Sequence, residues 1–386
     1  MKKLEHKVPN LRFKDFTDDW EQRKLGEIST SFSGGTPSVK NKSYYGGKIP
    51  FIRSAEIHKD KTELFITENG LKNSSAKLIK KGTLLYALYG ATSGEVDVSN
   101  IDGAINQAIM AIFLQKDNVS FIKYYLEKNK YKIIAKYLQG GQGNLSASII
   151  KSVHINLPFT EEQLKISNLI KKVESLISLQ QQKLDLLKQL KKGLLQKMFA
   201  EKNSKQPVLR FKGFHDDWEQ RKLKDVVEKQ IKGKAQFEKL APGEVEYLDT
   251  SRLNGGQAIL TNGLKDVTLD DILILWDGSK AGTVYHGFEG ALGSTLKAYR
   301  TSANSKFVYQ YLKRHQDNIY NNYRTPNIPH VQKDFLNVFT ISVPVSDEQE
   351  KIGSFFQQLD NTIVLQHQKI AKYQSIKKSL LQQMFI

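Results

Sequence analysis

The sequence contains no cysteine, so disulfide bonds and cysteine-ligated zinc are excluded. It also lacks any long uncharged apolar run, and its opening, MKKLEHKVPN, lacks the apolar segment of a secretory signal. These absences predict a cytoplasmic protein that is neither secreted nor inserted in a membrane. With 386 residues, 39% of them hydrophobic, the chain is long enough for two to four folded domains.

Motifs of catalysis and cofactor binding are missing as well. No G-x-G-x-x-G follows a predicted strand, no G-x-x-x-x-G-K-[ST] occurs, and the Pro-Pro-Tyr signature of amino-methyltransferases is absent. The eight histidines are scattered without metal-ligand spacing. The glycine-rich segments SFSGGTPS and LQGGQGNLSAS are more typical of loops at a recognition surface than of phosphate cradles. We therefore predict a binding protein with no catalytic residue, metal or cofactor of its own.

Acidic residues are fewer than basic residues in this sequence. The chain has 58 Lys and Arg against 40 Asp and Glu, a net charge of +18. Such an excess favours a polyanionic partner, above all nucleic acid. The alternative is a lysine-rich protein whose charge only keeps it soluble.

Two segments of the sequence each occur twice. The octapeptide DDWEQRKL stands at Asp18–Leu25 and at Asp216–Leu223, each time after a related segment, PNLRFKDFT or PVLRFKGFH. A second repeat ends each copy, because Ile155–Ala200 aligns without a gap to Ile341–Ile386, 186 positions later. The middles between these repeats do not resemble each other closely. This pattern indicates a common frame that carries two different readers.

The first repeat of each copy, here called the leader, has aromatic residues that are the same in both copies. A residue that reads a target would be expected to change between two different readers. We therefore expect the leader aromatics to anchor each middle to the frame; they are Phe13, Phe16, Trp20, Phe211, Phe214 and Trp218.

The second repeat predicts one long helix in each copy. Thr160–Gln163 and Ser346–Gln349 each fit a capping box, and no proline interrupts residues 161–199, which would form a helix of about 58 Å. Apolar residues spaced by three and four predict a coiled-coil seam between the two helices, packed antiparallel. The alternative is that each helix packs on its own domain. The predicted seam consists of Ile166, Leu169, Val173, Leu176, Leu184, Leu187, Leu190, Leu194 and Met198, and of Ile352, Phe355, Leu359, Ile363, Ile370, Tyr373, Ile376, Leu380 and Met384.

The apolar rhythm breaks near the midpoint of each helix, at Gln180 and Gln366. We expect these two side chains to face each other and to fix the register of the helices by hydrogen bonding, as buried polar seam residues can. The alternative is a pair of solvated glutamines.

The middles, about 29–154 and 228–340, mix strand-like and helix-like segments. Strand-like runs are IPFIRS, GTLLYALYG and AIMAIFL in the first and DILILWDG and GTVYHGF in the second, and a helix is expected late in each, at 119–138 and 305–323. The expected fold class is α+β, with two mixed α/β domains separated by two long antiparallel coiled-coil helices in an internal pseudo-twofold repeat. The expected division is a first leader and domain at 1–154, a first helix and linker at 155–205, a second leader and domain at 206–340, and a second helix at 341–386.

Each middle offers loops rich in polar and aromatic residues that suit DNA reading. Asn and Gln can pair with adenine, and Arg or Lys with guanine. Each residue taken alone could equally serve as a turn residue, a structural hydrogen bonder or a phosphate contact. The candidates are Ser33, Thr36, Tyr89, Thr92, Ser93, Asn106, Gln107, Gln142, Asn144 and Ser146 in the first middle, and Arg252, Asn254, Trp276, Ser279, Lys280, Ser294, Thr295, Tyr323, Arg324 and Asn327 in the second.

The order of these segments resembles the specificity subunit of a type I restriction–modification system over essentially the whole chain. The resemblance is carried by the leader DWEQRKL, the helix openings LPFTEEQ and VPVSDEQEKI, and the terminal SLLQQMF. It implies a subunit without activity of its own, in which each middle is a target-recognition domain that reads one half of an asymmetric, bipartite DNA site. It also implies that the paired helices set the length of the unread spacer.

The resemblance further implies partners. The helices would dock two methyltransferase (modification) subunits, which use S-adenosylmethionine, and two restriction/translocase subunits would use ATP and Mg. Double-stranded DNA would be this chain's own ligand.

Two other classes of protein stay open. A stand-alone bivalent DNA-binding regulator or architectural protein would bind DNA tightly as a purified chain, and a scaffold that does not bind DNA would form complexes insensitive to salt.

Overall fold

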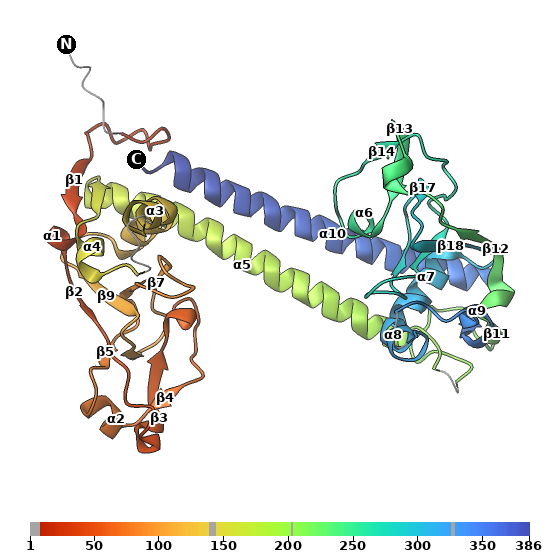
Figure 1. The fold of residues 1–386 in the computed structure, drawn as a ribbon, viewed down its shortest axis with the longest axis horizontal. Coiled ribbons are helices and arrows are strands. Elements are labelled where there is room, and N and C mark those ends of the chain that lie inside the picture. Colours follow the sequence, from red (N-terminus) through yellow and green to blue (C-terminus); the bar gives the residue numbers. More distant parts are fainter. Residues whose placement is uncertain (1–7, 139–143, 202–203, 326–328) are drawn as a thin grey trace, which may run out of the picture. The chain divides into compact units, whose positions relative to one another are not determined.

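The computed structural model describes residues 8–138, 144–201, 204–325 and 329–386. They form two compact units: unit 1 contains the residues up to Leu179 together with Ile370–Ile386, and unit 2 contains Gln180–Lys369. Two long helices, α5 (Thr160–Lys197, yellow-green in Figure 1) and α10 (Ser346–Gln383, blue), each contribute a segment to both units. Each unit therefore consists of a leader, one middle, the start of its own helix and the end of the other copy's helix.

Unit 1 contains three sheets. The first two have the strand orders β1-β10 and β2-β9-β6-β7, and the third has the order β4-β3-β8-β5. The strands are β1 (Glu21–Lys24), β2 (Ser29–Ser33), β3 (Tyr45–Ile52), β4 (Phe65–Ile66), β5 (Lys77–Ile79), β6 (Leu84–Ala87), β7 (Val96–Val98), β8 (Gly103–Ile105), β9 (Ile109–Leu114) and β10 (His154–Leu157). The helices are α1 (Leu25–Ile28), α2 (Glu68–Lys72), α3 (Val119–Leu138) and α4 (Ala147–Lys151).

Unit 2 repeats this plan, with strand orders β11-β19, β12-β18-β15-β16 and β14-β13-β17. The strands are β11 (Glu219–Lys222), β12 (Val227–Lys232), β13 (Pro242–Leu248), β14 (Leu260–Thr261), β15 (Ile272–Leu275), β16 (Val284–Tyr285), β17 (Ala291–Leu292), β18 (Leu296–Thr301) and β19 (Thr340–Val343). The helices are α6 (Thr250–Leu253), α7 (Ser305–Arg314), α8 (Gln316–Asn322) and α9 (Phe335–Val338). The antiparallel four-stranded sheets match in order, and both units add one parallel pair, β3 with β8 and β13 with β17.

One inner strand of each antiparallel four-stranded sheet, β6 or β15, is buried on both faces. In β6, Leu84 and Tyr86 face one hydrophobic core while Leu85 and Ala87 face another. In β15, alternate residues likewise enter two different cores. A strand buried on both faces has no polar side to alternate with, so the runs predicted as strands are apolar throughout.

The late helix of each middle is confirmed in unit 1 and corrected in unit 2. Residues 119–138 form the single helix α3, whereas the segment expected as one helix at 305–323 is broken at His315 into α7 and α8. The His315 backbone leaves the helical region at φ −94° and ψ 14°. Its ring stacks on Tyr311, with Nδ1 2.8 Å from the Tyr311 carbonyl oxygen. These contacts hold the chain out of a regular helix at this point.

The long helices run antiparallel, as predicted. In unit 2, Gln180 of α5 contacts Gln366 of α10, and Lys191 of α5 contacts Asp360 of α10. A later residue of α5 thus meets an earlier residue of α10, as antiparallel helices require. The predicted seam is too wide, because Leu176, Leu190 and Ile376 are 39%, 52% and 38% exposed. Two packed helices bury a narrow stripe, and their remaining apolar residues face outward.

The first turns of each long helix pack on the domain of the same copy. Ile166 and Ile170 of α5 lie in the core of unit 1, and Ile352 and Phe356 of α10 lie in the core of unit 2. The two packing alternatives for these helices are therefore both realised, at different positions along the same helix.

The leaders have the anchoring role predicted for them. Their octapeptides end in β1 and β11, which pair with the strand that enters each long helix, β10 or β19. Trp20 is buried against Phe121 and Phe385, and Trp218 is buried against Phe307 and Phe199. Each leader thus joins its own domain to the end of the other copy's helix.

The predicted capping boxes are replaced by contacts to the domains. Gln163 Nε2 donates hydrogen bonds to the Pro158 carbonyl and to Asp117, and its Oε1 accepts the Asn118 backbone N–H at 2.8 Å. Gln349 makes the equivalent contacts with Pro344 and Asn304. These glutamines couple the start of each long helix to the late helix of the middle. None of the described helices has an apolar stretch long enough to cross a membrane.

Candidate nucleic-acid interface

Four loops converge beside the β2-β9-β6-β7 sheet of unit 1, and backbone hydrogen bonds hold them together. The Gly34 N–H donates to the Ile109 carbonyl at 3.4 Å, and the Leu88 N–H donates to the Ala108 carbonyl at 2.8 Å. The Leu88 carbonyl in turn accepts the N–H of Leu145 at 2.9 Å. We call residues 33–36, 88–94, 105–107 and 144–146 loop cluster 1.

The same hydrogen bonds recur in unit 2. Gly233 donates to Leu296 at 3.0 Å, Trp276 donates to Thr295 at 2.8 Å, and Val331 donates to Trp276 at 2.9 Å. The corresponding loops are residues 232–235, 276–282, 292–294 and 330–332, which we call loop cluster 2. The two middles therefore present equivalent loops, although their sequences do not resemble each other closely.

Close backbone approach explains one glycine that the two clusters share. A Cβ atom on Gly34 would lie 1.9 Å from the Ile105 carbonyl oxygen, and one on Gly233 would lie 2.0 Å from the Gly293 carbonyl oxygen. Only glycine allows these contacts. The backbone geometry is thus shared, and the chemistry of each cluster depends on its side chains.

In loop cluster 1 the structure brings together Thr36, Tyr89 and Gln107, three of the predicted residues from three different loops. The Thr36 hydroxyl and the Tyr89 hydroxyl both contact the Gln107 side chain by hydrogen bonds. Burial raises the pKa of Tyr89, so this hydroxyl stays protonated and can donate. The group is neutral and offers amide and hydroxyl hydrogen bonds, which suits contact with base edges.

Three other candidates of unit 1 hold the loops in place by hydrogen bonds to the backbone. The Ser93 hydroxyl donates to the Leu88 carbonyl at 3.1 Å, Asn106 Oδ1 accepts the Ala108 N–H at 3.2 Å, and Ser146 caps α4 at 3.3 Å. These three residues shape the loops. Ser33 and Thr92 are half-buried and Asn144 is exposed, while Gln142 lies outside the described residues.

Loop cluster 2 borders a hollow of about 450 Å³. Two predicted residues line it, Trp276 and Ser294. The remaining lining residues were not among the predicted candidates, although the sequence segments LWDGSKAG and ALGSTLK, expected to be DNA-reading loops, contain three of them; they are Gln230, Lys232, Asp277, Leu296, Lys297, His330 and Lys333. Lys232 and Lys297 are direct cross-strand partners in the β12–β18 pair, and only the register of these strands reveals that they are neighbours.

Several candidates of unit 2 are engaged elsewhere. Arg252 pairs with Glu246, and Asn254 donates to the Thr250 carbonyl at 2.6 Å and to the Tyr285 hydroxyl at 3.2 Å. Arg324 donates to the Tyr320 carbonyl at 2.8 Å and to the Ser279 carbonyl at 3.0 Å, which ties down the 276–282 loop.

The last five candidates of unit 2 differ in their surroundings. Tyr323 packs on Phe335 and Phe339, and the Thr295 carbonyl accepts the Trp276 N–H. Ser279 and Lys280 are exposed on their loop, and Asn327 lies outside the described residues.

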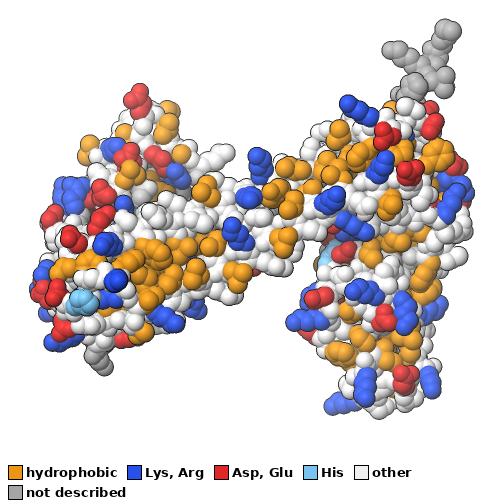
Figure 2. Space-filling model, turned by 180° about the vertical axis from the view of Figure 1, so that it is seen from behind, with side chains coloured by type: hydrophobic (Ala, Val, Ile, Leu, Met, Phe, Trp, Pro, Cys, Tyr) orange, Lys and Arg blue, Asp and Glu red, His pale blue; other side chains and the backbone are white. Residues whose placement is uncertain are grey.

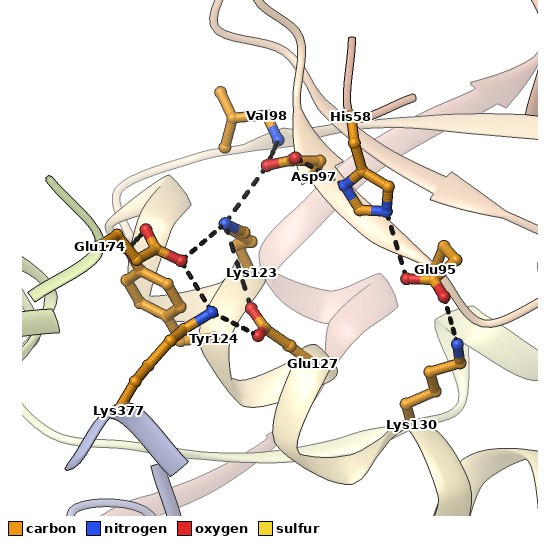
Figure 3. Close-up of polar contacts among 10 residues, drawn as sticks. All are labelled: His58, Glu95, Asp97, Val98, Lys123, Tyr124, Glu127, Lys130, Glu174 and Lys377. Atoms are coloured by element: carbon orange, nitrogen blue, oxygen red, sulfur yellow. Dashed lines mark hydrogen bonds and ion pairs between the residues drawn. The ribbon is translucent and has the colours of Figure 1, made fainter. Parts of the chain in front are cut away.

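A polar network connects the middle of unit 1 to both long helices (Figure 3). Lys377 Nζ of α10 lies 2.8 Å from Glu174 of α5 and 2.7 Å from Glu127 of α3. The Tyr124 hydroxyl donates to Glu174 at 2.5 Å, and Lys123 reaches both Glu174 and the β7 residue Asp97. Burial alone would raise the pKa of Glu174, but Lys123 and Lys377 hold it below its ordinary value. The carboxylate therefore stays ionised and paired.

The network continues to His58 in the middle. His58 Nδ1 lies 2.7 Å from Asp97 and Nε2 lies 3.2 Å from Glu95, which also pairs with Lys130 of α3 (Figure 3). The hydrogen bond to Asp97 raises the pKa of His58. The turn that carries His58 and the β7 segment are thus cross-linked to α3, which is itself bound to the long helices.

Unit 2 contains the counterpart of this cross-helix contact. Asp360 and Lys191, which correspond to Glu174 and Lys377 in the repeat, pair at 2.5 Å, and Gln310 of α7 donates to Asp360 at 2.7 Å. The ion pair between the long helices is therefore present in both units, whereas the side chains of loop clusters 1 and 2 differ. Among residues 8–138, 144–201, 204–325 and 329–386, no three His, Asp or Glu side chains gather closely enough to hold a metal ion.

Comparison with known proteins identifies a family match over most of the chain. The family model for the type I restriction modification DNA specificity domain matches residues 17–189 and again 215–374. The MjaIX type I restriction enzyme specificity subunit of Methanocaldococcus jannaschii is 30% identical over 194 residues, which are 47% of this chain and 44% of that protein. The putative MjaX specificity subunit of the same organism is 23% identical over 95% of this chain and 93% of its own length. The chain thus spans less than half of the first relative and nearly all of the second.

The fold of the whole chain is also found in solved structures. A type I restriction-modification system S subunit from M. genitalium has a TM-score of 0.70 at 17% identity, over 98% of this chain and 99% of that one. A chain from a type I R-M system assembly has a TM-score of 0.58 at 15% identity, over 94% and 96% of the two chains. At these identities the likeness concerns the fold.

Proposed function

Because the chain belongs to the family of type I restriction modification DNA specificity domains, we propose that it is the sequence-specificity subunit of a type I restriction–modification complex. Each middle would read one half of a bipartite, asymmetric DNA site, and the chain itself would catalyse no reaction. The division at 1–154, 155–205, 206–340 and 341–386 would then separate two readers, each with its leader, from two spacer helices.

The observation that carries the proposal is the contrast between frame and loops. Ion pairs, leader aromatics and backbone hydrogen bonds repeat in both units, whereas the side chains of loop clusters 1 and 2 differ. In protein–DNA interfaces, base contacts specify the sequence while other contacts position the protein. A constant frame with two different clusters is what reading two different half-sites requires.

The long helices supply the surface for partner subunits in this proposal. They expose apolar residues that their mutual packing leaves uncovered, and Figure 2 shows hydrophobic side chains along the paired helices among lysines. The exposed residues are Leu164, Leu176, Leu179, Leu186 and Leu190 of α5, and Val364, Leu365 and Ile376 of α10. Two methyltransferase subunits, which bring S-adenosylmethionine, would dock here, and two restriction/translocase subunits would bring ATP and Mg.

Base-resolution mapping of methyladenine tests the proposal. DNA would be taken from cells that express this chain with candidate methyltransferase partners and from cells that lack only this chain. A split motif that is methylated only in the presence of the chain is the expected result. Soluble complex formation without new methylation would contradict the proposal and favour a stand-alone DNA-binding protein.

A further inference from the structure

The hollow beside loop cluster 2 has an excess of positive charge. Lys232 and Lys297 face each other across β12 and β18, and Lys333 adds a third ammonium group, against the single carboxylate of Asp277. Gln230 and Ser294 line the same space and can donate or accept hydrogen bonds. The hollow therefore suits an electron-rich partner that offers several acceptor atoms.

One of these lysines is held in place. Lys297 Nζ lies 3.2 Å from the ring centroid of Trp276, a cation–π contact with an indole that is only 8% exposed. Burial lowers the pKa of Lys297, while the nearby Asp277 opposes this shift. Within the described part of the chain, no hydrogen bond or ion pair engages this ammonium group. The N–H donors of Lys297 are thus held in position and do not bind another side chain among the described residues.

Among the described residues of unit 1, the equivalent positions carry neither the two cross-strand lysines nor the tryptophan. Matching the backbone hydrogen bonds of the two clusters puts Met110 at the position of Lys297, Ser33 at that of Lys232 and Leu88 at that of Trp276. Met110 is fully buried in the hydrophobic core. The two readers therefore differ at these positions, which carry uncharged side chains in unit 1 and lysines in unit 2.

We propose that Lys297 is a base-reading residue, which recognises a guanine in the half-site of the second domain; this inference rests on the proposed function. Guanine presents two acceptors, N7 and O6, in the major groove, whereas adenine presents a donor beside its N7. A fixed ammonium group with free donors distinguishes the two. A phosphate contact would require only charge, which an unrestrained exposed lysine supplies as well.

The test uses the complex of the chain with its methyltransferase partners. Methylated motifs would be mapped for the wild type, for Lys297→Met, which introduces the residue found in unit 1, and for Lys297→Gln. The control is Lys229→Met, an exposed lysine on β12 that does not line the hollow. We expect one guanine position at which Lys297→Met loses about tenfold in discrimination. Lys297→Gln should also lose the guanine preference, whereas Lys229→Met and the other half-site should match the wild type.

Several results would overturn the inference. These are a wild-type motif without guanine in either half-site, an unchanged motif in both Lys297 variants, or methylation that falls equally for DNA of every sequence. Failure of both variants to assemble with the partners would assign Lys297 a structural role and overturn it too. Absence of methylation with the wild-type chain would instead contradict the proposed function. The experiment therefore distinguishes failure of the proposed function from failure of the inference about Lys297.

Discussion

Gln366 Nε2 donates a hydrogen bond to Gln180 Oε1 at 2.7 Å, between the two long helices of the protein. The same amide group lies 3.0 Å from the Gln180 carbonyl oxygen, and Gln366 is only 6% exposed. The predicted contact between these glutamines is confirmed, and their alternative as two solvated side chains is not realised. We propose that the pair fixes the register of the helices, because shifting either helix by one turn would bury an unpaired amide.

Replacing Gln366 with leucine tests this role. Q366L should lower the free energy of unfolding by about 1–2 kcal/mol, because Gln180 loses its partner at a partly buried position. The double variant Q180L/Q366L should recover most of the loss but relax the register. Thermal unfolding measures the first effect, and the spread of spacer lengths in methylated motifs measures the second. A single sharp spacer in the double variant would show that the pair does not set the register.

A longer pair of helices should lengthen the unread spacer of the DNA site. Four residues inserted after Gln181 in α5 and four after His367 in α10 add about 6 Å, the rise of roughly two base pairs. We expect a methylated motif with the same two half-sites and about two more base pairs between them. An unchanged spacer in a stable variant would contradict the idea that the helices measure it.

The leader arginines should stabilise the two units independently. The Arg12 guanidinium donates two hydrogen bonds of 2.8 Å to the Glu162 carboxylate. The Arg210 guanidinium donates two hydrogen bonds to Glu348, at 2.7 and 2.8 Å, and both carboxylates are buried. Removing either guanidinium leaves a buried carboxylate unpaired, so R12M and R210M should each cost about 3 kcal/mol. Hydrogen exchange should show the loss in unit 1 for R12M and in unit 2 for R210M.

A matched control for the leader arginines is R23M. Arg23 pairs with Glu21 and Glu27 at the surface, where water compensates the loss, so exchange rates should not change. Equal losses in R23M and R12M would contradict the assigned role of the buried pairs.

The stability of unit 2 should rise with pH between about 8 and 10.5. Burial lowers the pKa of Lys313 from 10.5 to about 8, with a further decrease from Lys191 and an opposing effect of Asp360. The folded state therefore releases this proton at a lower pH than the unfolded state, so the unfolded state binds more protons in this range. The gain is at most about 3 kcal/mol, and it is lost as the pH falls towards 8.

The variant K313M isolates this effect from other titrations. It should be more stable than the wild type at pH 7, and its unfolding free energy should rise less between pH 8 and 10.5. Chemical denaturation across this range measures both. Parallel pH profiles of K313M and the wild type would show that Lys313 keeps its ordinary pKa.

Patterns along the chain predicted the elements that depend on local physics. Thr160–Lys197 forms a helix because an acidic first turn, an absence of proline and regular apolar spacing act within a few residues of one another. The broken helix at His315 was missed because the break involves a tertiary contact of the His315 ring with Phe339, in addition to its local stacking on Tyr311 four residues earlier. Gln163 was misassigned for the same reason, since Asn118, which competes for its side chain, lies 45 positions away.

By itself the sequence determined the duplication, the two long helices, the anchoring leaders and the apolar strands, because repetition and periodicity are written in neighbouring residues. Only the tertiary structure decided which side chains meet. Lys297 joins Lys232 through strand register and Trp276 through a loop, and Thr36 meets Tyr89 and Gln107 across three loops. Register and loop closure depend on contacts between residues far apart in the chain, and no local pattern encodes them.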